Sequence, residues 1–257
     1  MATIDEIKKE RLKKLERIQK SGVLAYPAQS KRTHTAVEAG KDFAKLSKAE
    51  KEIIIAGRIR AMRGHGGSMF INVEDGTGNF QAYLKKDRVG EKSYDFFLEN
   101  FDVGDFAQLR GILFTTKKGE KTLEIADYKI LTKALLPLPE KWHGLQDEEE
   151  RYRKRYLDLL FNAKVKENFE KKAAITKAIR EFLEKEGFVG VETSVLQSIY
   201  GGAEAQPFKT YLNAFDMEMY LRIALELDLK RLIVGGFEKV YEIGRVFRNE
   251  GVDRMHN

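Results

Sequence analysis

The residues with the clearest chemical potential lie near the end of the chain. Arg248 and Glu250 close the segment VYEIGRVFRNEG, whose first part is typical of a β-strand. Residues two apart on an extended chain point to the same face. A guanidinium and a carboxylate on one face can hold a phosphate and an amino group together. The same pair could instead be an ordinary surface ion pair, worth about 0–1 kcal/mol.

Two further features of this part of the chain could contact a ligand. Glu226 opens the segment ELDLK, which predicts a helix start. A carboxylate there could bind an ammonium group, or it could simply favour the helix N-terminus. Gly201 and Gly202 permit a close approach of the backbone to a ligand, or an ordinary loop.

Aromatic, amide and cationic side chains in the middle of the chain could bind single-stranded nucleic acid. Phe70 could stack on a base, which contributes roughly 1–3 kcal/mol per base. Gln81 could hydrogen-bond to a base edge, and Arg58 and Arg63 could hold phosphates or stack on bases. The alternative is that Phe70 belongs to the hydrophobic core and Gln81 is a plain surface residue.

Covalent catalysis and metal chemistry are not indicated by the sequence. It contains no cysteine, which excludes a disulfide scaffold, a thiol nucleophile and a Cys-ligated metal. The four histidines do not cluster along the sequence, and HExxH, GxSxG and Walker A patterns are absent from it. We therefore expect no metal ligands within this sequence.

The composition predicts a folded, water-soluble protein of one large or two modest domains. The chain has 257 residues, of which 42% are hydrophobic and 33% are charged. It has no apolar run near the ~18–20 residues that cross a bilayer, and its N-terminus MATIDEIKKERLKK is charged. We therefore expect a cytoplasmic protein without a membrane partner.

The positive charge is concentrated at the front of the chain. The net charge of +6 divides into +5 for residues 1–50, +2 for 51–146 and −1 for 147–257. This distribution suits a polyanion-binding module attached to something else, although a well-solvated helix would also explain it.

The first half of the chain predicts the elements that would position Phe70 and Gln81. A capping-box pattern at Thr3 and Glu6 opens an amphipathic helix over 3–20, and a polar connector follows at 26–39. Five strands with one helix between the third and fourth favour an OB-fold barrel over other small barrels. The strands are expected at 52–62, 68–73, 80–84, 105–116 and 121–131, and the helix at 91–100.

The second half mixes helices and strands without regular βαβ alternation, which favours an α+β domain. The expected helices lie at 147–160, 163–186 and 226–234, and the expected strands at 188–195, 220–223 and 239–247. Two of the four prolines mark a boundary at 136–139. We expect a helical extension at 1–50, a barrel domain at 51–146 and a mixed domain at 147–257.

Taken together, these segments resemble class II lysyl-tRNA synthetases. LTKALLPLPEKWHGLQDEEERYRKRYLDL (131–159) is similar to the hinge and opening helix of the lysyl branch. Residues 220–251 resemble the region that runs into motif 2, and residues 163–196 resemble motif 1, the dimer interface of the family. GGAEAQPF points to the lysyl branch rather than the aspartyl or asparaginyl one. The resemblance implies an α+β protein with an N-terminal OB-fold anticodon-binding barrel followed by a class II antiparallel-sheet catalytic domain.

The resemblance also implies roles for single residues. In the barrel, positions that recognise a uridine-rich anticodon correspond to Phe70, Gln81 and Glu120. In the second domain, Gly202 and Glu226 correspond to positions that bind the lysine α-amino group. Arg248 corresponds to the arginine that contacts the lysine carboxylate and the ATP α-phosphate. Glu250 corresponds to the residue that meets the adenine amino group, and His256 would lie near the triphosphate.

The implied reaction needs no protein nucleophile. The lysine carboxylate attacks the α-phosphorus of ATP to give lysyl-adenylate and pyrophosphate, and the terminal hydroxyl of the tRNA then takes the lysyl group. Arg248 and Mg²⁺ would stabilise the charge that develops on the phosphate. The implied partners are lysine tRNA, lysine, ATP and a second copy of the chain.

The sequence departs from the family pattern at several positions. Unusual residues near the motifs are Ser194, Gln206, Leu225, Asp228 and Met255. The sequence stops at Asn257, inside motif 2, so motif 3 and the Mg²⁺ ligands would lie downstream. We therefore expect an N-terminal portion that binds the anticodon but does not aminoacylate tRNA by itself.

Three other functions stay open at this stage. The chain could be a stand-alone OB-fold RNA binder whose second half is degenerate, or a fragment that only dimerises through its motif 1 region. It could also be a related ligase that lysylates a protein. Retention of Arg248, Glu250 and Glu226 argues against the first, and the OB-fold segment argues against the last.

Overall fold

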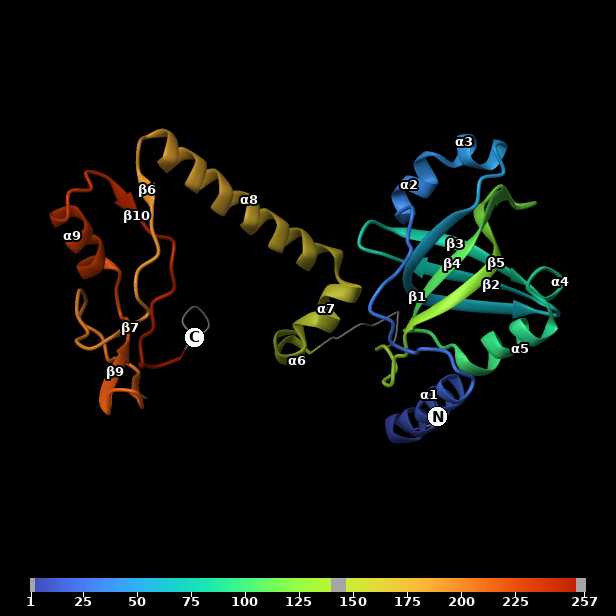
Figure 1. The fold of residues 1–257 in the computed structure, drawn as a ribbon, viewed down its shortest axis with the longest axis horizontal. Helices are drawn as coiled ribbons and strands as arrows, with labels where there is room; N and C mark the ends of the chain where they lie inside the picture. The colour runs from blue at the N-terminus through green and yellow to red at the C-terminus, as the bar shows by residue number, and fades with distance from the viewer. Residues whose placement is uncertain (1–2, 140–146, 253–257) are drawn as a thin grey trace. The chain divides into compact units, whose positions relative to one another are not determined.

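The computed structural model describes residues 3–139 and 147–252. By its internal contacts the chain divides into two compact units, Met1–Asp147 and Glu148–Asn257. We call them the barrel unit and the C-terminal unit. The barrel unit holds long strands wound into a closed sheet, and the C-terminal unit holds one long helix with short strands (Figure 1).

The barrel unit contains a closed five-stranded barrel in the order β1-β2-β3-β5-β4. Its strands are β1 (Ile53–His65), β2 (Ser68–Glu74), β3 (Asn79–Lys85), β4 (Phe106–Thr115) and β5 (Lys121–Thr132). The two helices between β3 and β4 are α4 (Lys86–Val89) and α5 (Glu91–Asn100). Five strands with a helical connection after the third confirm the expected OB-fold.

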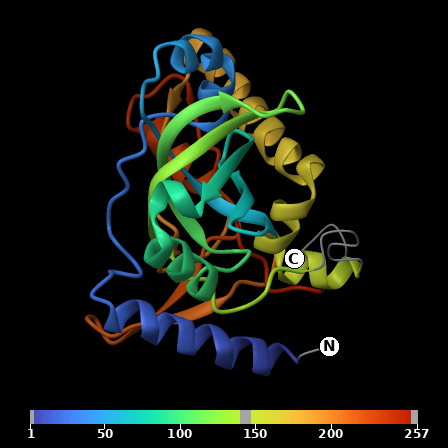
Figure 2. The ribbon, with the colours of Figure 1, turned by 90° about the vertical axis from the view of Figure 1, so that its right-hand side faces the viewer.

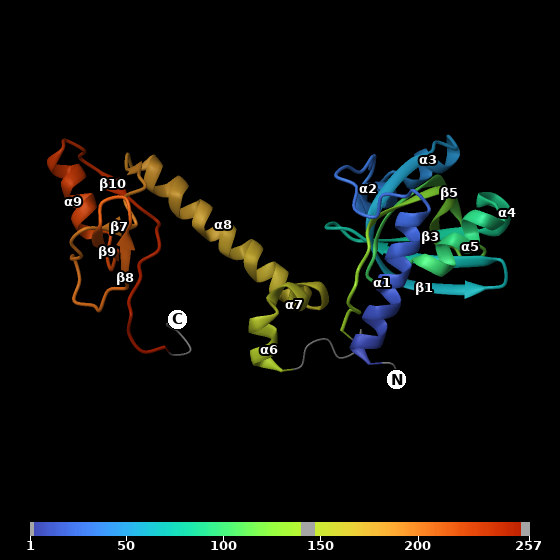
Figure 3. The same cartoon turned by 60° about the horizontal axis from the view of Figure 1, so that its bottom comes forward.

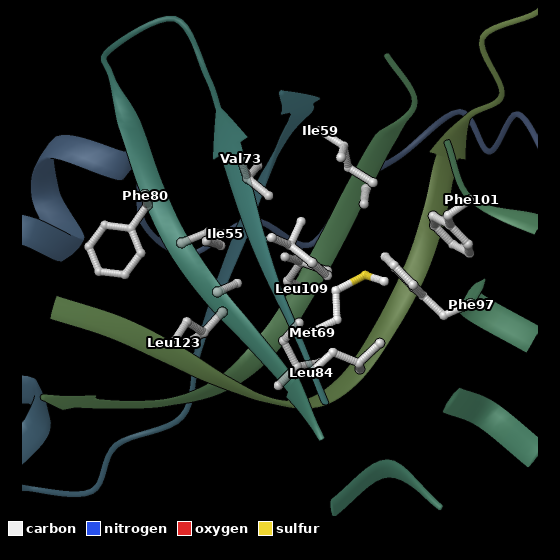
Figure 4. Packing of buried hydrophobic residues seen from close by; sticks show 14 of the residues in the cluster. Ile55, Ile59, Met69, Val73, Phe80, Leu84, Phe97, Phe101, Leu109 and Leu123 are labelled. Atoms are coloured by element: carbon white, nitrogen blue, oxygen red, sulfur yellow. The ribbon is translucent and has the colours of Figure 1, made fainter. Parts of the chain in front are cut away.

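The barrel closes because its strands alternate apolar and polar residues, which places one face of each strand inside. Along β3, Phe80, Ala82 and Leu84 are buried, while Gln81 and Tyr83 lie on the outer face. Buried side chains from all five strands meet α5 in one cluster, as Figure 4 shows for ten labelled residues. The alternation thus decides which side chains of β3 remain available to a ligand.

Helix α1 (Ile4–Lys20) is held to the barrel unit by apolar and charged contacts. The expected capping box is present, because Thr3 accepts from the N–H of Glu6 and Glu6 accepts from the N–H of Thr3. Ile18 is fully buried in the core. Arg11 donates to the backbone oxygens of Leu136 (2.9 Å), Ala134 (3.1 Å) and Val103 (3.1 Å). Figure 3 shows α1 lying along the barrel unit.

Two short helices were missed by the sequence pattern. The predicted connector at 26–39 already contains the start of α2 (Ala36–Lys41), which α3 (Phe43–Lys48) follows. Their buried residues are only Ala36, Ala39, Phe43 and Leu46, too few to produce a visible helical period. Figure 2 shows these helices at one end of the barrel and α1 at the other.

The C-terminal unit is α+β, as expected. Its helices are α6 (Glu148–Arg153), α7 (Arg155–Phe161), α8 (Ala163–Lys185) and α9 (Glu226–Val234). Its strands are β6 (Val189–Gly190), β7 (Leu196–Gln197), β8 (Lys209–Leu212), β9 (Met217–Leu221) and β10 (Val240–Tyr241). β6 pairs with β10 in parallel, and β7-β9-β8 forms an antiparallel sheet.

Several predicted elements of this unit differ in the structure. The strand expected at 188–195 is limited to β6 (Val189–Gly190). The single helix expected at 147–160 is broken at Lys154, where the backbone leaves the helical region. The strand expected at 239–247 ends at Tyr241, so the interpretation that Arg248 closes a strand is wrong. The chain beyond Tyr241 makes single backbone bonds, from Phe247 to Arg222 and from Asn249 to Gln206, instead of a continuous ladder.

Candidate functional site

A groove of about 810 Å³ lies on the outer face of the barrel. It runs over β1, β2 and β3 and is bordered by the end of β4 and the turn before β5. Its lining residues are Arg60, Ala61, Arg63, Phe70, Ile71, Asn72, Glu74, Asn79, Gln81, Tyr83, Phe114, Thr116, Lys117, Lys118 and Glu120. The groove thus gathers four of the five residues predicted to bind nucleic acid: Arg63, Phe70, Gln81 and Glu120.

Aromatic rings form part of the groove surface. Phe70 is 38% exposed, so the alternative that it belongs to the core is wrong. It faces Tyr83 across the β2–β3 register, with ring centroids 4.7 Å apart, and Tyr83 lies 6.1 Å from Phe114. Exposed rings of this kind can stack on bases. Tyr83 could have been found in the sequence, since it shares the β3 face of Gln81 two residues away.

Cationic side chains outnumber carboxylates in the groove. The cations are Arg60, Arg63, Lys117 and Lys118, and the carboxylates are Glu74 and Glu120. Such an excess favours a polyanion. Arg60 is the extra residue of a β-bulge between Ile59 and Ala61, and it forms a 2.7 Å ion pair with Glu74. Arg60 and Arg63 are three positions apart, an odd spacing that puts residues of a regular strand on opposite faces, and the bulge lets both line one groove.

Arg58 lies outside the groove. Its guanidinium sits 4.4 Å from the centre of the Phe106 ring on β4 and donates to the backbone oxygen of Gly104 at 3.1 Å. Burial lowers the pKa of Arg58 from its ordinary value. These contacts give Arg58 a structural position at the β1–β4 seam rather than a place beside Phe70.

The side-chain amide of Gln81 is held in one orientation in the groove. The side-chain nitrogen of Gln81 donates to the hydroxyl of Thr122 at 2.8 Å. Glu120 is exposed on the β4–β5 turn, whose backbone is closed by bonds between Thr116 and Glu120. An oriented amide beside a stacking ring can distinguish base edges by their donors and acceptors.

In the C-terminal unit the structure brings Gly202 and Glu226 together. Gly202 has φ +85°, and a Cβ at this position would lie 3.2 Å from the Cβ of Glu226 and of Ala224. Only glycine adopts this conformation readily while approaching the first turn of α9 so closely. The Glu226 carboxylate is exposed and forms a 2.5 Å ion pair with Lys230.

Arg248 and Glu250 also lie in the C-terminal unit and are exposed. The backbone of Gln206 joins this segment, because it accepts from the N–H of Asn249 at 2.7 Å and donates to the Glu250 carboxylate at 3.3 Å. His256, predicted to contact a triphosphate, falls outside the described residues.

A buried ion pair that the sequence did not reveal is bonded to the backbone just before Arg248. Arg222 and Glu242 meet at 2.7 Å, and their side chains are only 4% and 3% exposed. Arg222 also donates to the backbone oxygens of Arg245 (2.9 Å) and Thr193 (3.2 Å), and Glu242 accepts from the Thr193 hydroxyl at 2.6 Å. No local spacing signals such a cluster, since Thr193, Arg222 and Glu242 are at least 20 residues apart from one another.

Residues 3–139 and 147–252 contain no candidate metal centre and no candidate membrane span. In these ranges no group of three or more His, Asp or Glu side chains could hold a metal ion. Within the same ranges, no helix is long and apolar enough to span a membrane.

Comparison with known families agrees with this geometry. Residues 53–131 match the family described as OB-fold nucleic acid binding domain, and residues 147–257 match tRNA synthetases class II (D, K and N). Residues 147–257 are therefore similar to the class II tRNA synthetases of this group, and an OB-fold nucleic acid binding domain precedes them.

Its curated relatives narrow the group to one branch. The chain is 50% identical over 254 residues to a lysine–tRNA ligase of Carboxydothermus hydrogenoformans, which aligns 99% of this chain and 51% of the relative. Lysine–tRNA ligases of Thermotoga maritima and Clostridium novyi are 46% and 49% identical over 258 and 257 residues. These alignments cover 99% and 100% of this chain, and 51% and 50% of the relatives. The chain thus spans about half the length of the curated relatives it matches.

Proposed function

We propose that the barrel unit binds the uridine-rich anticodon of lysine tRNA through the groove. The observation that carries this proposal is the exposed Phe70 ring, paired with Tyr83 and placed beside Gln81 in a cation-bordered groove. Phe70 and Tyr83 offer stacking surfaces, and Gln81 and Glu120 can form hydrogen bonds with base edges. Arg63, Lys117 and Lys118 carry positive charge that attracts the phosphates.

The C-terminal unit supplies part of a site that activates lysine with ATP in this proposal. Gly202 lets the chain approach Glu226, whose carboxylate takes the α-amino group of lysine. Arg248 takes the lysine carboxylate and the α-phosphate, and Glu250 accepts from the adenine amino group. Mg²⁺, when bound with ATP, supplies further charge stabilisation at the phosphates. The described residues present no group of three or more side chains that could hold a metal ion, so we propose no Mg²⁺ ligand among them.

In this proposal the chain does not aminoacylate tRNA by itself. The chain matches only about half of the length of lysine–tRNA ligases, so the proposed role is anticodon binding together with part of the lysine and ATP site. The alternative of an RNA-binding module whose second half only dimerises would retain the barrel groove but need neither Glu226 nor Arg248.

The test of the anticodon proposal is removal of the Phe70 ring. In Phe70→Ala, affinity for a lysine-tRNA anticodon stem–loop is expected to fall by about 1–3 kcal/mol, because one stacking platform is lost. Fluorescence anisotropy with the labelled stem–loop measures this change. The control is Phe96→Ala, which removes a ring of α5 outside the groove residues. Equal affinity of the wild-type chain for a stem–loop with an altered anticodon would contradict the proposal.

A second copy of the chain is the proposed partner of helix α8. Ile175, Ile179 and Phe182 form one face of this helix, and they are 62%, 47% and 62% exposed. Ile179→Asp is expected to weaken dimerisation about tenfold or more, because an unpaired carboxylate would be buried in the interface. Sedimentation velocity over a concentration series measures it. Ala173→Asp, on another face of α8, should leave dimerisation unchanged, and a wild-type chain that stays monomeric would refute the proposal.

A further inference from the structure

Gln81 and Thr122 are linked in a way that orients the glutamine amide. They are direct partners in the parallel pairing of β3 with β5, and Gln81 Nε2 donates to Thr122 Oγ1 at 2.8 Å. Thr122 is fully buried, and its hydroxyl donates to the backbone oxygen of Glu120 at 3.2 Å. A carbonyl oxygen can only accept, so the single hydroxyl proton of Thr122 is committed to Glu120. Thr122 Oγ1 can therefore only accept from Gln81, and the amide must present its nitrogen.

We infer that Thr122 is a positioning residue that makes the groove select uridine over cytidine, an inference that rests on the proposed anticodon binding. The hydrogen-bond chain from Gln81 through Thr122 to Glu120 sets which amide atom faces the barrel. One amide N–H is used by Thr122, and the amide oxygen with the second N–H remains for a base. The amide thus offers an acceptor beside a donor in a fixed order.

The fixed order matters because uridine and cytidine differ by an exchange of donor and acceptor. Uridine presents N3–H as a donor beside the O4 acceptor, whereas cytidine presents N3 as an acceptor beside the N4 amino donor. A freely rotating amide satisfies either base by turning through 180°. For Gln81 that turn would set its oxygen against Thr122 Oγ1, with no proton between the two acceptors. The locked amide pairs with N3–H and O4 of uridine and opposes like groups on cytidine.

The neighbouring groups support this arrangement. Phe70 pairs with Tyr83, two residues along β3 from Gln81, so an aromatic platform lies on the same strand face to hold the base. Glu120 receives the Thr122 hydroxyl on its backbone oxygen, which also accepts from the N–H of Thr116 at 3.0 Å. Thr122 therefore anchors both the Gln81 amide and the turn that carries the Glu120 carboxylate.

The test compares Thr122→Val with the wild-type chain on four RNAs. One is a stem–loop with the UUU anticodon, and the others each replace a single uridine by cytidine. The wild-type chain is expected to prefer uridine by about tenfold or more at one position at least, the range of a good bidentate contact. Thr122→Val keeps the shape and strand preference of threonine but lets the amide turn. It is expected to reduce that preference to about threefold or less while keeping affinity for UUU within about threefold.

Two variants serve as controls for this experiment. Thr122→Ser keeps the hydroxyl and should keep the preference for uridine. Thr132→Val makes the same change at an exposed threonine of β5, whose hydroxyl donates to the backbone oxygen of Leu131, and should change neither affinity nor preference. Thermal unfolding reports whether each variant folds. If Thr122→Val does not fold, Thr122→Ala removes the same hydroxyl and gives the same readout.

The outcomes separate this inference from the proposed function. Retention of the full uridine preference by a folded Thr122→Val chain would overturn the inference and leave the proposed function standing. An equal loss of affinity for all four RNAs would also overturn it, since it would indicate a general packing role. A wild-type chain that binds all four RNAs equally would overturn the proposed function, and this inference with it.

Discussion

Replacement of Lys133 by methionine is expected to lower the free energy of unfolding of the barrel unit by about 3–5 kcal/mol. The side chains of Lys133 and Asp105 are both 0% exposed, and the ammonium donates to the Asp105 carboxylate at 2.8 Å and to Asp102 at 2.5 Å. Methionine fills a similar volume but cannot donate a hydrogen bond. The loss would leave the Asp105 carboxylate buried without its cation, although it keeps the backbone N–H groups of Asp102 and Ala134.

The pH dependence of this defect follows from the two carboxyl groups. Burial raises the pKa of Asp105, and Lys133 offsets this only in part. Burial also acts to raise the pKa of Asp102, but hydrogen bonds from Lys133 and Lys14 outweigh it and lower that pKa. Without Lys133, the pKa of Asp105 should rise further above its unfolded value of about 3.9. A carboxyl with a raised folded pKa binds its proton more tightly in the folded state, so the variant regains stability as the pH falls.

Urea unfolding at pH 5 and pH 8 measures both effects. The difference in unfolding free energy between wild type and Lys133→Met should be larger at pH 8 than at pH 5. The control is Lys129→Met, the same change at an exposed lysine of β5, which should stay within about 0.5 kcal/mol of wild type. A defect in Lys133→Met no larger than that of the control would show that the buried pair does not carry the predicted stability.

Replacement of Arg222 by methionine is expected to destabilise the C-terminal unit by a similar amount, about 3–5 kcal/mol. The change would leave the buried Glu242 carboxylate with hydrogen bonds from Thr193 but no cation. It would also remove side-chain bonds that join the Arg245 and Thr193 backbones. Because the lost guanidinium bond to the Arg245 backbone oxygen lies three residues before Arg248, the segment that precedes Arg248 should loosen as well.

Amide hydrogen exchange read by mass spectrometry measures this change within one unit. Segments around Val189–Gly190 and Val240–Tyr241 should exchange faster in Arg222→Met, while the barrel strands keep wild-type rates. Arg245→Met, at an exposed arginine nearby, is the matched control and should have little effect. Adding Glu242→Gln to Arg222→Met removes the buried charge and should restore part of the protection. Unchanged exchange in Arg222→Met would refute the prediction.

Sequence periodicity was enough to predict the barrel, but it left open whether Phe70 lies in the core or on the accessible face. Strict alternation along β3 places Phe80 and Ala82 on one face and Gln81 and Tyr83 on the other. A shift of one residue in register would expose the buried face, so the register of such a strand is strongly specified. Periodicity was less informative where register is irregular. The bulge at Arg60 breaks the alternation of β1, so the sequence could not tell that Arg60 enters the groove while Arg58 turns toward Phe106.

The sequence by itself determined the kinds of side chain present, the strands of the barrel and the resemblance to class II lysyl-tRNA synthetases. Only the tertiary structure decided which distant residues act together. Thr122 contacts Gln81 although 41 positions separate them along the chain. Arg222 contacts Glu242 although helix α9 lies between them in the sequence. The physical reason is that strand pairing and burial join residues by register rather than by spacing along the chain. A hydrogen bond that orients an amide, or an ion pair that survives burial, therefore has no local signature in the sequence.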